Sequence, residues 1–168
     1  MKHLGLISIL AVAVMSASCG ILAQIDEENL KEAQGYVAKA LDEHELAIEV
    51  NRILPSRGPA ITSQDGYYLK VRDGKVNAYL PFFGTSYSAP IGTDDVGIKF
   101  EDCPIVIDDS QSKPSKGKFV WFFEARCRME KVYVTVTFWD NGSADIMCRP
   151  MNRSHMGYSG NLIAFPEK

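Results

Sequence analysis

Histidine, serine and lysine are the side chains of this chain that could carry catalysis, and none has the spacing that catalysis needs. His44-Glu45 begins like the helix of a zinc protease, but Ile48 occupies the position of the second histidine ligand. Ser110 and Lys113 are spaced as Ser-x-x-Lys, but they fall in a polar loop and not at the start of a helix. We therefore predict that the protein is not an enzyme.

Acidic residues and cysteines are the candidates for a metal site. The pairs Asp94-Asp95 and Asp108-Asp109 lack the alternate-position spacing and the following glutamate of a calcium loop. The 4 cysteines form neither a Cys-x-x-Cys motif nor a cluster with histidine. The basic residues form no run that would bind nucleic acid. We expect no metal, no cofactor and no nucleic-acid partner.

Aromatic residues give the main indication of binding. The adjacent pairs Phe82-Phe83 and Trp121-Phe122 must point to opposite faces of a strand, and the chain has more aromatic residues than one face of a small sheet needs. The surplus either lines a groove or cavity or packs beneath a covering helix. The candidate ligand-binding residues, centred on the corner from Pro81 to Tyr87, are Tyr79, Phe83, Tyr87 and Trp121.

The first residues have the composition of a bacterial secretory signal. Lys2 supplies a positive start, and the apolar run from Leu4 to Met15 is far shorter than the ~20 residues of a membrane-spanning helix. Small residues precede Cys19, so a lipoprotein peptidase would leave Cys19 as the acylated first residue, anchored to a membrane. The alternative is cleavage after Ala23 and simple secretion. We expect an exported protein of the periplasm or outer membrane.

Removal of the signal, residues 1–18, leaves an acidic chain. It takes away one of the 18 basic side chains, Lys2, and none of the 21 acidic ones, so the formal charge changes from −3 to −4. The remaining chain is long enough for one domain with its own core. We divide it into an N-terminal segment with a helix, residues 19–45, and a single β domain, residues 46–168.

One amphipathic helix is predicted over residues 26–44. Acidic residues at its start complement the helix dipole, and its charged face is expected to be solvated while its apolar face packs on a sheet. The apolar positions at three- and four-residue spacing are Leu30, Ala33, Val37, Ala40 and Leu41.

From Leu46 onward the apolar period becomes two, which is typical of β-strands. Asp73-Gly74 is a dipeptide of two-residue primed turns, so it predicts a hairpin. The expected pairs are Val71 with Val76 and Leu69 with Ala78.

The second half, from Phe119 to Arg149, predicts a meander of three strands. A three-residue connection, Asp140-Asn141-Gly142 with a left-handed glycine, keeps apolar residues together on one face. It pairs Phe138 with Ala144, Val136 with Ile146 and Val134 with Cys148. A two-residue turn at Glu130-Lys131 pairs Cys127 with Val134 and Ala125 with Val136 by the same reasoning.

This register has a consequence for the cysteines. Cys127 and Cys148 would lie on either side of Val134, with Cα atoms roughly 9 to 10 Å apart, which is beyond disulfide reach. We predict that both are free, buried thiols and that the domain relies on buried cysteines rather than crosslinks. For Cys103 the pattern indicates no partner.

The fold class follows from the number of strands. With a strand around His155 to Phe165 and one or two more at Val96 to Val106, the count reaches about eight or nine. An antiparallel meander of that size closes into a barrel or folds over as a sandwich. We predict a mainly all-β domain preceded by one helix.

Several short motifs follow one another in fixed order between residues 46 and 165. They include Tyr79-Leu80-Pro81-Phe82-Phe83-Gly84, Gly97-Ile98-Lys99-Phe100 and Tyr158-Ser159-Gly160. In sequence and order they resemble the exported bacterial family catalogued as domain of unknown function 4251. The resemblance implies an exported β domain without an assigned activity, so it brings no catalytic residues. The helix before residue 46 falls outside it.

These observations favour a non-enzymatic envelope module that binds an apolar or small ligand near Pro81 to Tyr87. The alternative is a structural or interaction lipoprotein, attached to the outer membrane and docking through exposed aromatic residues.

Overall fold

The computed structural model describes residues 27–85, 97–127 and 130–165. Within them a helix over residues 27–43 is followed by eight strands. The strands are β1 (Leu46–Pro55), β2 (Ile61–Arg72), β3 (Lys75–Leu80), β4 (Ile98–Pro104), β5 (Lys118–Cys127), β6 (Glu130–Trp139), β7 (Ser143–Pro150) and β8 (Met156–Leu162). The chain divides into two compact units, Met1–Glu32 and Ala33–Lys168, so the second part of the helix belongs to the unit that holds the strands.

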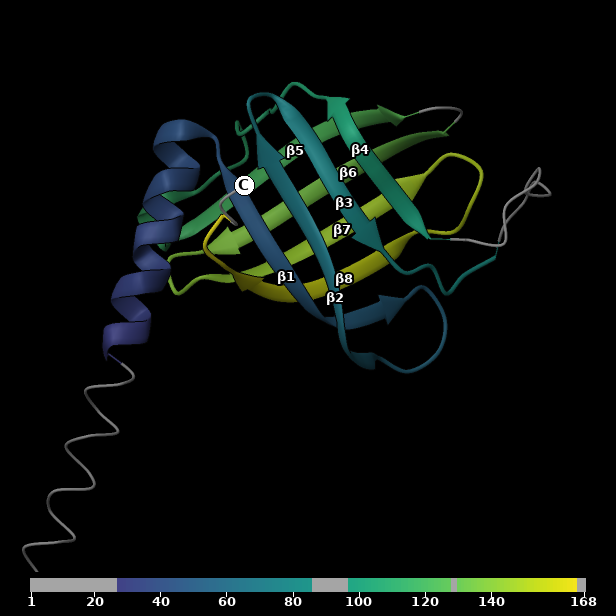
Figure 1. The fold of residues 1–168 in the computed structure, drawn as a ribbon, viewed down its shortest axis with the longest axis horizontal. Coiled ribbons are helices and arrows are strands. Elements are labelled where there is room, and N and C mark those ends of the chain that lie inside the picture. Colours follow the sequence, from purple (N-terminus) through teal and green to yellow (C-terminus); the bar gives the residue numbers. More distant parts are fainter. Residues whose placement is uncertain (1–26, 86–96, 128–129, 166–168) are drawn as a thin grey trace, which may run out of the picture. The chain divides into compact units, whose positions relative to one another are not determined.

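All eight strands form one antiparallel sheet in the order β4-β3-β2-β1-β8-β7-β6-β5. The first and last strands are neighbours in its middle, where Ile53 of β1 pairs with Tyr158 of β8. In Figure 1 the sheet curls so that the strands β5 to β8 cross behind β1 to β4. The result is a nearly closed barrel, which confirms the predicted fold class and selects the barrel over the sandwich.

The barrel has a seam between β4 and β5, the two outer strands of the sheet, which no ladder joins in the described part of the chain. The segment that follows β4 bridges part of it. The Ile105 N–H donates to the Gly74 carbonyl at 2.8 Å, and Asp108 exchanges two backbone hydrogen bonds of 2.8 Å with Phe122. Individual bonds from this segment, and not a continuous ladder, therefore connect the two edges.

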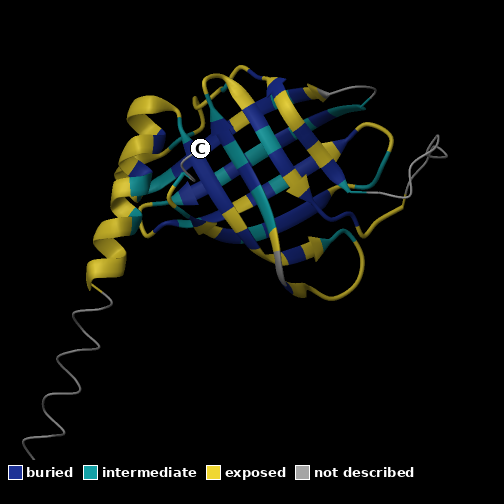
Figure 2. Cartoon of the chain, viewed as in Figure 1, coloured by how far each residue is buried: buried dark blue, intermediate teal, exposed yellow. Residues whose placement is uncertain are grey.

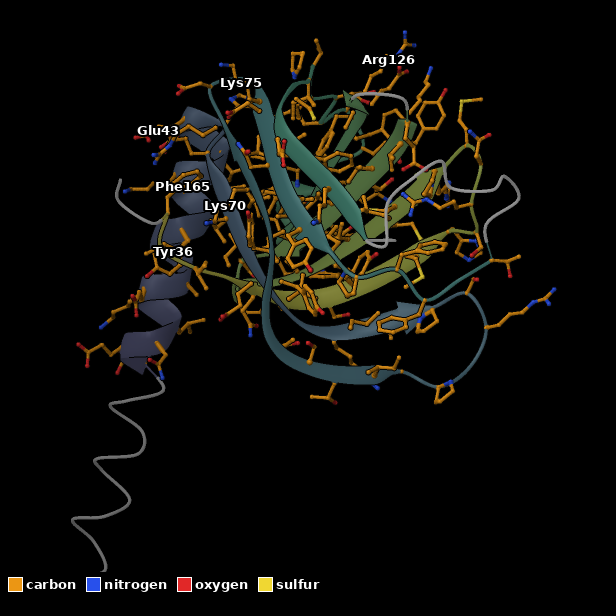
Figure 3. All side chains as sticks on the ribbon, turned by 45° about the vertical axis from the view of Figure 1, so that its right-hand side comes forward. Tyr36, Glu43, Lys70, Lys75, Arg126 and Phe165 are labelled. Carbon is orange, nitrogen blue, oxygen red and sulfur yellow. The ribbon has the colours of Figure 1, made fainter. Side chains whose placement is uncertain are left out.

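Side chains alternate between buried and exposed along the strands, as the colours of Figure 2 show. Lys75 and Arg126, labelled in Figure 3, project outward from the barrel. Large side chains fill the interior: Trp121 and Phe123 are each 1% exposed, and Tyr158 is 0% exposed. Since these side chains occupy the interior, a ligand site is expected at an end or on the outer face.

The helix over residues 27–43 has the predicted amphipathic character. Val37 and Ala40 are buried in the hydrophobic core, and Tyr36, labelled in Figure 3, packs against it. Leu41 remains 40% exposed, so the buried stripe in this part of the helix is narrower than the sequence pattern indicated. In the part of the chain that the structure describes, no helix has the length and apolar character needed to cross a membrane.

Two predicted turns are confirmed. Asp73 and Gly74 have φ values of 53° and 66°, as a two-residue primed turn requires, and Val71 pairs with Val76. Gly142 has φ 80°, and the strands that it connects have the expected register. The pairs there are Phe138 with Ala144, Val136 with Ile146 and Val134 with Cys148.

The predicted register of β5 against β6 is wrong. Ala125 pairs with Val132 and Phe123 with Val134, and Cys127 lies opposite Glu130. The connection therefore falls on residues 128–129, which lie outside the described residues, and not on residues 130–131. Alternation fixes only which face a residue occupies, and the true and predicted registers put the same apolar residues inside.

The cysteines differ in part from the expectation. Cys148 is free and buried, as predicted. Cys103 is disulfide-bonded, so the prediction that the domain relies on uncrosslinked cysteines is wrong. That prediction rested on the displaced β5–β6 register, and the side chain of Cys127 lies outside the described residues.

Candidate functional site

Sheet topology gathers several polar residues at one end of the barrel. Pro55, the last residue of β1, pairs with Met156 at the start of β8, and Met156 pairs in turn with Cys148 of β7. The residues just beyond these positions must therefore lie close together. They are Arg57 after β1, Arg149 at the end of β7, and Arg153 and His155 in the turn before β8.

These residues line an open cleft of about 820 Å³. Its volume lies within the ~300–1,000 Å³ of typical small-molecule sites. Its basic side chains are Arg57, Arg149, Arg153 and His155. The uncharged residues of the lining are Ser56, Phe83, Gly84, Thr85, Pro150 and Ser154. It combines an exposed aromatic ring with several hydrogen-bond donors.

The segment after β3 supplies the apolar part of the cleft and is fixed from two sides. The buried Tyr158 hydroxyl donates to the Pro81 carbonyl at 2.8 Å. At the other end the Thr85 N–H donates to Ser154 Oγ at 3.1 Å, and the Ser154 N–H donates to the Thr85 carbonyl at 2.9 Å. Phe83, between these anchors, is thus held beside the turn that carries His155.

Gly84 allows this close approach. A Cβ at this position would overlap Ser154 Oγ and would lie 2.8 Å from the ring of Phe82. A side chain at position 84 would therefore require the Ser154 hydroxyl and the Phe82 ring to move.

Arg153 is committed to its own neighbours. Its Nε donates to Glu130 Oε1 at 2.9 Å, and its second nitrogen bonds the other carboxylate oxygen of Glu130. The guanidinium also lies over the ring of Phe82, 4.7 Å from the ring centroid. This bidentate pair ties β6 to the cleft wall, so Arg153 serves to position the wall.

Arg57 and Arg149 are differently placed. Both are exposed, and the described residues provide neither with an ion-pair or hydrogen-bond partner. Guanidinium groups carry a permanent positive charge, so within the described part of the chain these two present charge to the cleft that no carboxylate pairs. Among the described lining residues none is acidic.

The structure separates the four residues predicted to bind ligand. Phe83 lines the cleft and is 49% exposed. Tyr79 lies on the outer face of β3. Its ring centroid is 5.4 Å from that of Tyr67 and 4.8 Å from the ammonium nitrogen of Lys99. Trp121 lies in the core at 1% exposure.

Two further predicted residues, Tyr87 and the lipidation site Cys19, lie outside the described residues.

The core position of Trp121 has a clear cause. It is on the inward face of β5. Its ring meets that of Phe138 edge-on, with centroids 5.3 Å apart. It also stacks on the ring of His44, just after the helix, with centroids 5.9 Å apart. Trp121 is therefore a core residue, and the rings in contact with it are those of Phe138 and His44. His44, with φ 54°, ends the helix in the left-handed region.

Sequence reasoning missed the cleft arginines. Arg149 and Arg153 are four residues apart, but Arg57 is distant from both in the chain, and no local motif connects it to them. Only the pairing of β1 with β8, the first and last strands, brings Arg57 to the end of the barrel where Arg149 and Arg153 lie. The one local signal was the turn-rich stretch after Pro55, which marks the end of β1. In the described part of the chain, His, Cys, Asp and Glu form no group of three that could hold a metal ion.

Comparison with known proteins assigns the family. A search of curated proteins finds no match. The crystal structure of a DUF4251 family protein from Bacteroides eggerthii DSM 20697 has a similar fold, with a TM-score of 0.59 and 20% sequence identity, over 78% of this chain and 87% of that one. The family model described as domain of unknown function (DUF4251) matches residues 28–162, and so includes the helix that the sequence motifs left out. The chain belongs to the DUF4251 family.

Proposed function

We propose that the protein is a non-enzymatic binding module of the bacterial envelope, and that its ligand site is the cleft at the end of the barrel. The observation that carries this proposal is the fixed position of Phe83. Its ring is 49% exposed inside a cleft of about 820 Å³, while the segment around it is anchored by Tyr158 and Ser154. An exposed ring on a rigid segment binds apolar groups with little loss of conformational entropy.

The substitution Phe83→Ala tests the proposal, with Phe122→Ala as its matched control. Phe122 is also a partly exposed phenylalanine, at 39%, but it lies on the outer face of β5. A library of small aromatic and aliphatic compounds is screened against the wild-type protein by amide shifts in two-dimensional NMR. We expect shifts at Gly84, Thr85 and Ser154, and affinities that Phe83→Ala lowers about tenfold, as loss of a ring contact worth about 1.4 kcal/mol predicts.

Phe122→Ala should leave the same affinities unchanged. If compounds bind elsewhere, or bind the Phe83→Ala variant as well as the wild type, the cleft is not the ligand site.

Export and lipidation belong to the same proposal. The leader sequence and Cys19 support a mature protein that begins at an acylated Cys19 and is held at the membrane surface. Intact-mass measurement of the membrane fraction should find a diacylglyceryl increment on Cys19, and Cys19→Ser should move the protein into the soluble fraction. A soluble protein that begins at Gln24 would instead support cleavage after Ala23.

A second candidate function, a lipoprotein that docks another envelope protein, is favoured by the seam between β4 and β5. Val106 is 87% exposed there, beside a hollow of about 270 Å³ that is also lined by Pro104, Ile105 and Glu124. A photo-crosslinking residue in place of Val106 should then capture one defined protein in intact cells, while the same residue in place of Asn141 should not. Equal, diffuse crosslinking at both positions would count against this function.

A further inference from the structure

The cleft has a charge opposite to that of the chain that carries it. The chain has a formal charge of −3, yet the described lining holds three arginines and a histidine and no acidic residue. We propose that the ligand of this cleft is a soluble small molecule with an anionic group, phosphate or carboxylate, joined to an apolar part. This inference rests on the proposed function and names its ligand class.

Arg57 and Arg149 are the residues that would hold the anion. They approach the cleft from separate elements, the turn after β1 and the end of β7, and neither has a partner among the described residues. Each guanidinium can donate two parallel hydrogen bonds to a carboxylate or phosphate. An anion between these elements would give both groups a partner, which the described residues do not provide.

Other donors of the cleft are already engaged. Arg153 is bonded to Glu130, so it contributes a rigid wall more than a free charge. The backbone N–H groups of Thr85 and Ser154 are bonded to Ser154 Oγ and to the Thr85 carbonyl. The charged donors of the cleft that are not paired to a described carboxylate are therefore Arg57 and Arg149, with the exposed His155 beside them.

Phe83 determines the rest of the ligand. Its half-exposed ring and the ring of Pro150 are the apolar groups of the lining. A ligand with an aromatic or short aliphatic group beside its anion would contact Phe83 while the anion reaches the arginines. Such a ligand satisfies both halves of the cleft at once.

The charge of the whole protein favours a soluble ligand over a membrane headgroup. A protein with a net negative charge is repelled from an anionic lipid surface, whether or not a lipid anchor tethers it nearby, while the basic residues of the cleft attract an anion locally. A free phosphate or carboxylate compound can enter the cleft. An extended, negatively charged membrane surface is repelled by the rest of the protein before it reaches the cleft.

Four probes test the inference at matched ionic strength: phenyl phosphate, inorganic phosphate, benzyl alcohol and monomeric dihexanoyl phosphatidylglycerol. Binding to the purified protein is followed through the amide signals of Gly84, Thr85 and Ser154. We expect phenyl phosphate to bind at least about tenfold more tightly than benzyl alcohol, because charged hydrogen bonds contribute more than ring contact alone in this open site. Inorganic phosphate lacks the ring, so it should bind more weakly than phenyl phosphate. It should shift the same amide signals.

The variants Arg57→Gln and Arg149→Gln should each weaken phenyl phosphate about five- to tenfold and leave benzyl alcohol unchanged. Arg52→Gln is the matched control, since it removes the same charge from an exposed arginine of β1 outside the cleft lining. It should alter neither affinity.

The possible failures are distinguishable. Suppose that benzyl alcohol binds as tightly as phenyl phosphate and that the arginine variants leave both affinities unchanged. The cleft is then a ligand site, but the inference that it selects anionic ligands is wrong. If none of the four probes shifts the cleft amides, both the inference and the proposed function fail. Tighter binding of the phospholipid than of phenyl phosphate would overturn the soluble ligand in favour of a lipid headgroup.

Discussion

At the scale of single residues, Tyr158 connects the barrel interior to the cleft. Its ring is buried, and its hydroxyl is the donor that holds the Pro81 carbonyl at the start of the segment carrying Phe83. Burial, with a smaller contribution from the neighbouring Cys148, raises the pKa of this hydroxyl above its ordinary value of 10.0. The hydroxyl therefore remains protonated and donates at every physiological pH.

Tyr158→Phe should lower the free energy of unfolding by about 1–3 kcal/mol, since it leaves a carbonyl at a buried site without its donor. The ring is retained, so packing is preserved and the change isolates the hydrogen bond. Urea unfolding followed by tryptophan fluorescence provides the measurement. Tyr68→Phe is the control, because Tyr68 is only partly buried and its ring lies under the ammonium group of Lys70. Equal stability of the two variants would show that the Tyr158 bond does not hold the segment.

Arg153 shows why the cleft wall was invisible in the sequence. Its role in positioning the cleft wall depends on Glu130 at the start of β6 and on Phe82 after β3, which are far from it in the chain. A lone arginine in a polar turn has no distinguishing pattern. Its role appears only when three elements are brought together.

At the scale of elements, turn chemistry was predictable and register was only partly so. Asp73-Gly74 and Gly142 require positive φ, and that requirement fixed the β2–β3 and β6–β7 registers correctly. The β5–β6 connection at residues 128–129 has no glycine or asparagine, so nothing local marked it. Alternation then left registers that differ by an even number of residues equally acceptable.

The candidate site was predicted to the same limited extent. The adjacent aromatics Phe82-Phe83 directed attention to a segment that lines the cleft, because neighbouring residues of an extended segment point to opposite sides. Trp121 was predicted to bind ligand, and the predicted strand pattern does place it on the inward face with Ala125, but alternation cannot show whether an inward ring lines a cavity or packs in the core. The arginines could not be found without the β1–β8 pairing.

The β1–β8 pair joins the two halves of the barrel, and at Gly160 the two strands leave no room for a side chain. A Cβ at Gly160 would overlap the Glu49 carbonyl oxygen on the neighbouring strand. Gly160→Ala should therefore force β1 and β8 apart and lower the free energy of unfolding by at least about 2 kcal/mol. Thermal and urea unfolding measure the loss, and hydrogen exchange at β1 should accelerate.

Gly35→Ala is the counterpart with the opposite sign. Gly35 is exposed in the helix, and a Cβ there would meet no atom within 4 Å. Alanine should stabilise the helix by about 0.5–1 kcal/mol, because it loses less backbone entropy than glycine. A Gly160→Ala variant as stable as Gly35→Ala would mean that the two strands are not packed as closely as described.

At the scale of the whole molecule, the disulfide of Cys103 bears on the proposal that the chain is an exported lipoprotein. Cys148 is free, so the partner of Cys103 in an intramolecular bond is Cys19 or Cys127. A lipidated Cys19 has its sulfur in a thioether and cannot form a disulfide. The lipoprotein proposal therefore predicts a bond between Cys103 and Cys127 in the mature protein, against the free Cys127 expected from the sequence.

Non-reducing tryptic mapping tests this pairing. The peptide that begins at Phe100 should be recovered linked to the peptide that contains Cys127, while Cys148 should alkylate only after unfolding. Reduction should release the linked pair. Recovery of Cys103 linked to Cys19 would exclude lipidation at Cys19.

The whole barrel should also lose stability in alkaline solution, for a reason located in its core. Burial, with a smaller effect of Glu130, raises the pKa of the Cys148 thiol from 9.0 to about 12, and burial raises that of Tyr158 above 10.0. Both groups are neutral in the folded state and ionise more easily in the unfolded chain. Their contribution to stability is therefore complete below pH 9 and declines as the pH rises from 9 towards 12, with a slope approaching about 1.4 kcal/mol per pH unit for each fully buried group.

Urea unfolding at pH 8.0, 9.5 and 10.5 should show this decline in the wild type. Cys148→Ala lacks the thiol, so its free energy of unfolding, although lower at pH 8.0 because a buried side chain is truncated, should fall less steeply above pH 9. Tyr158→Phe should lose its share of the slope from pH 10 upward for the same reason. Parallel curves for the wild type and both variants would assign the alkaline loss to other groups and would show that ionisation of these two side chains is not linked to folding.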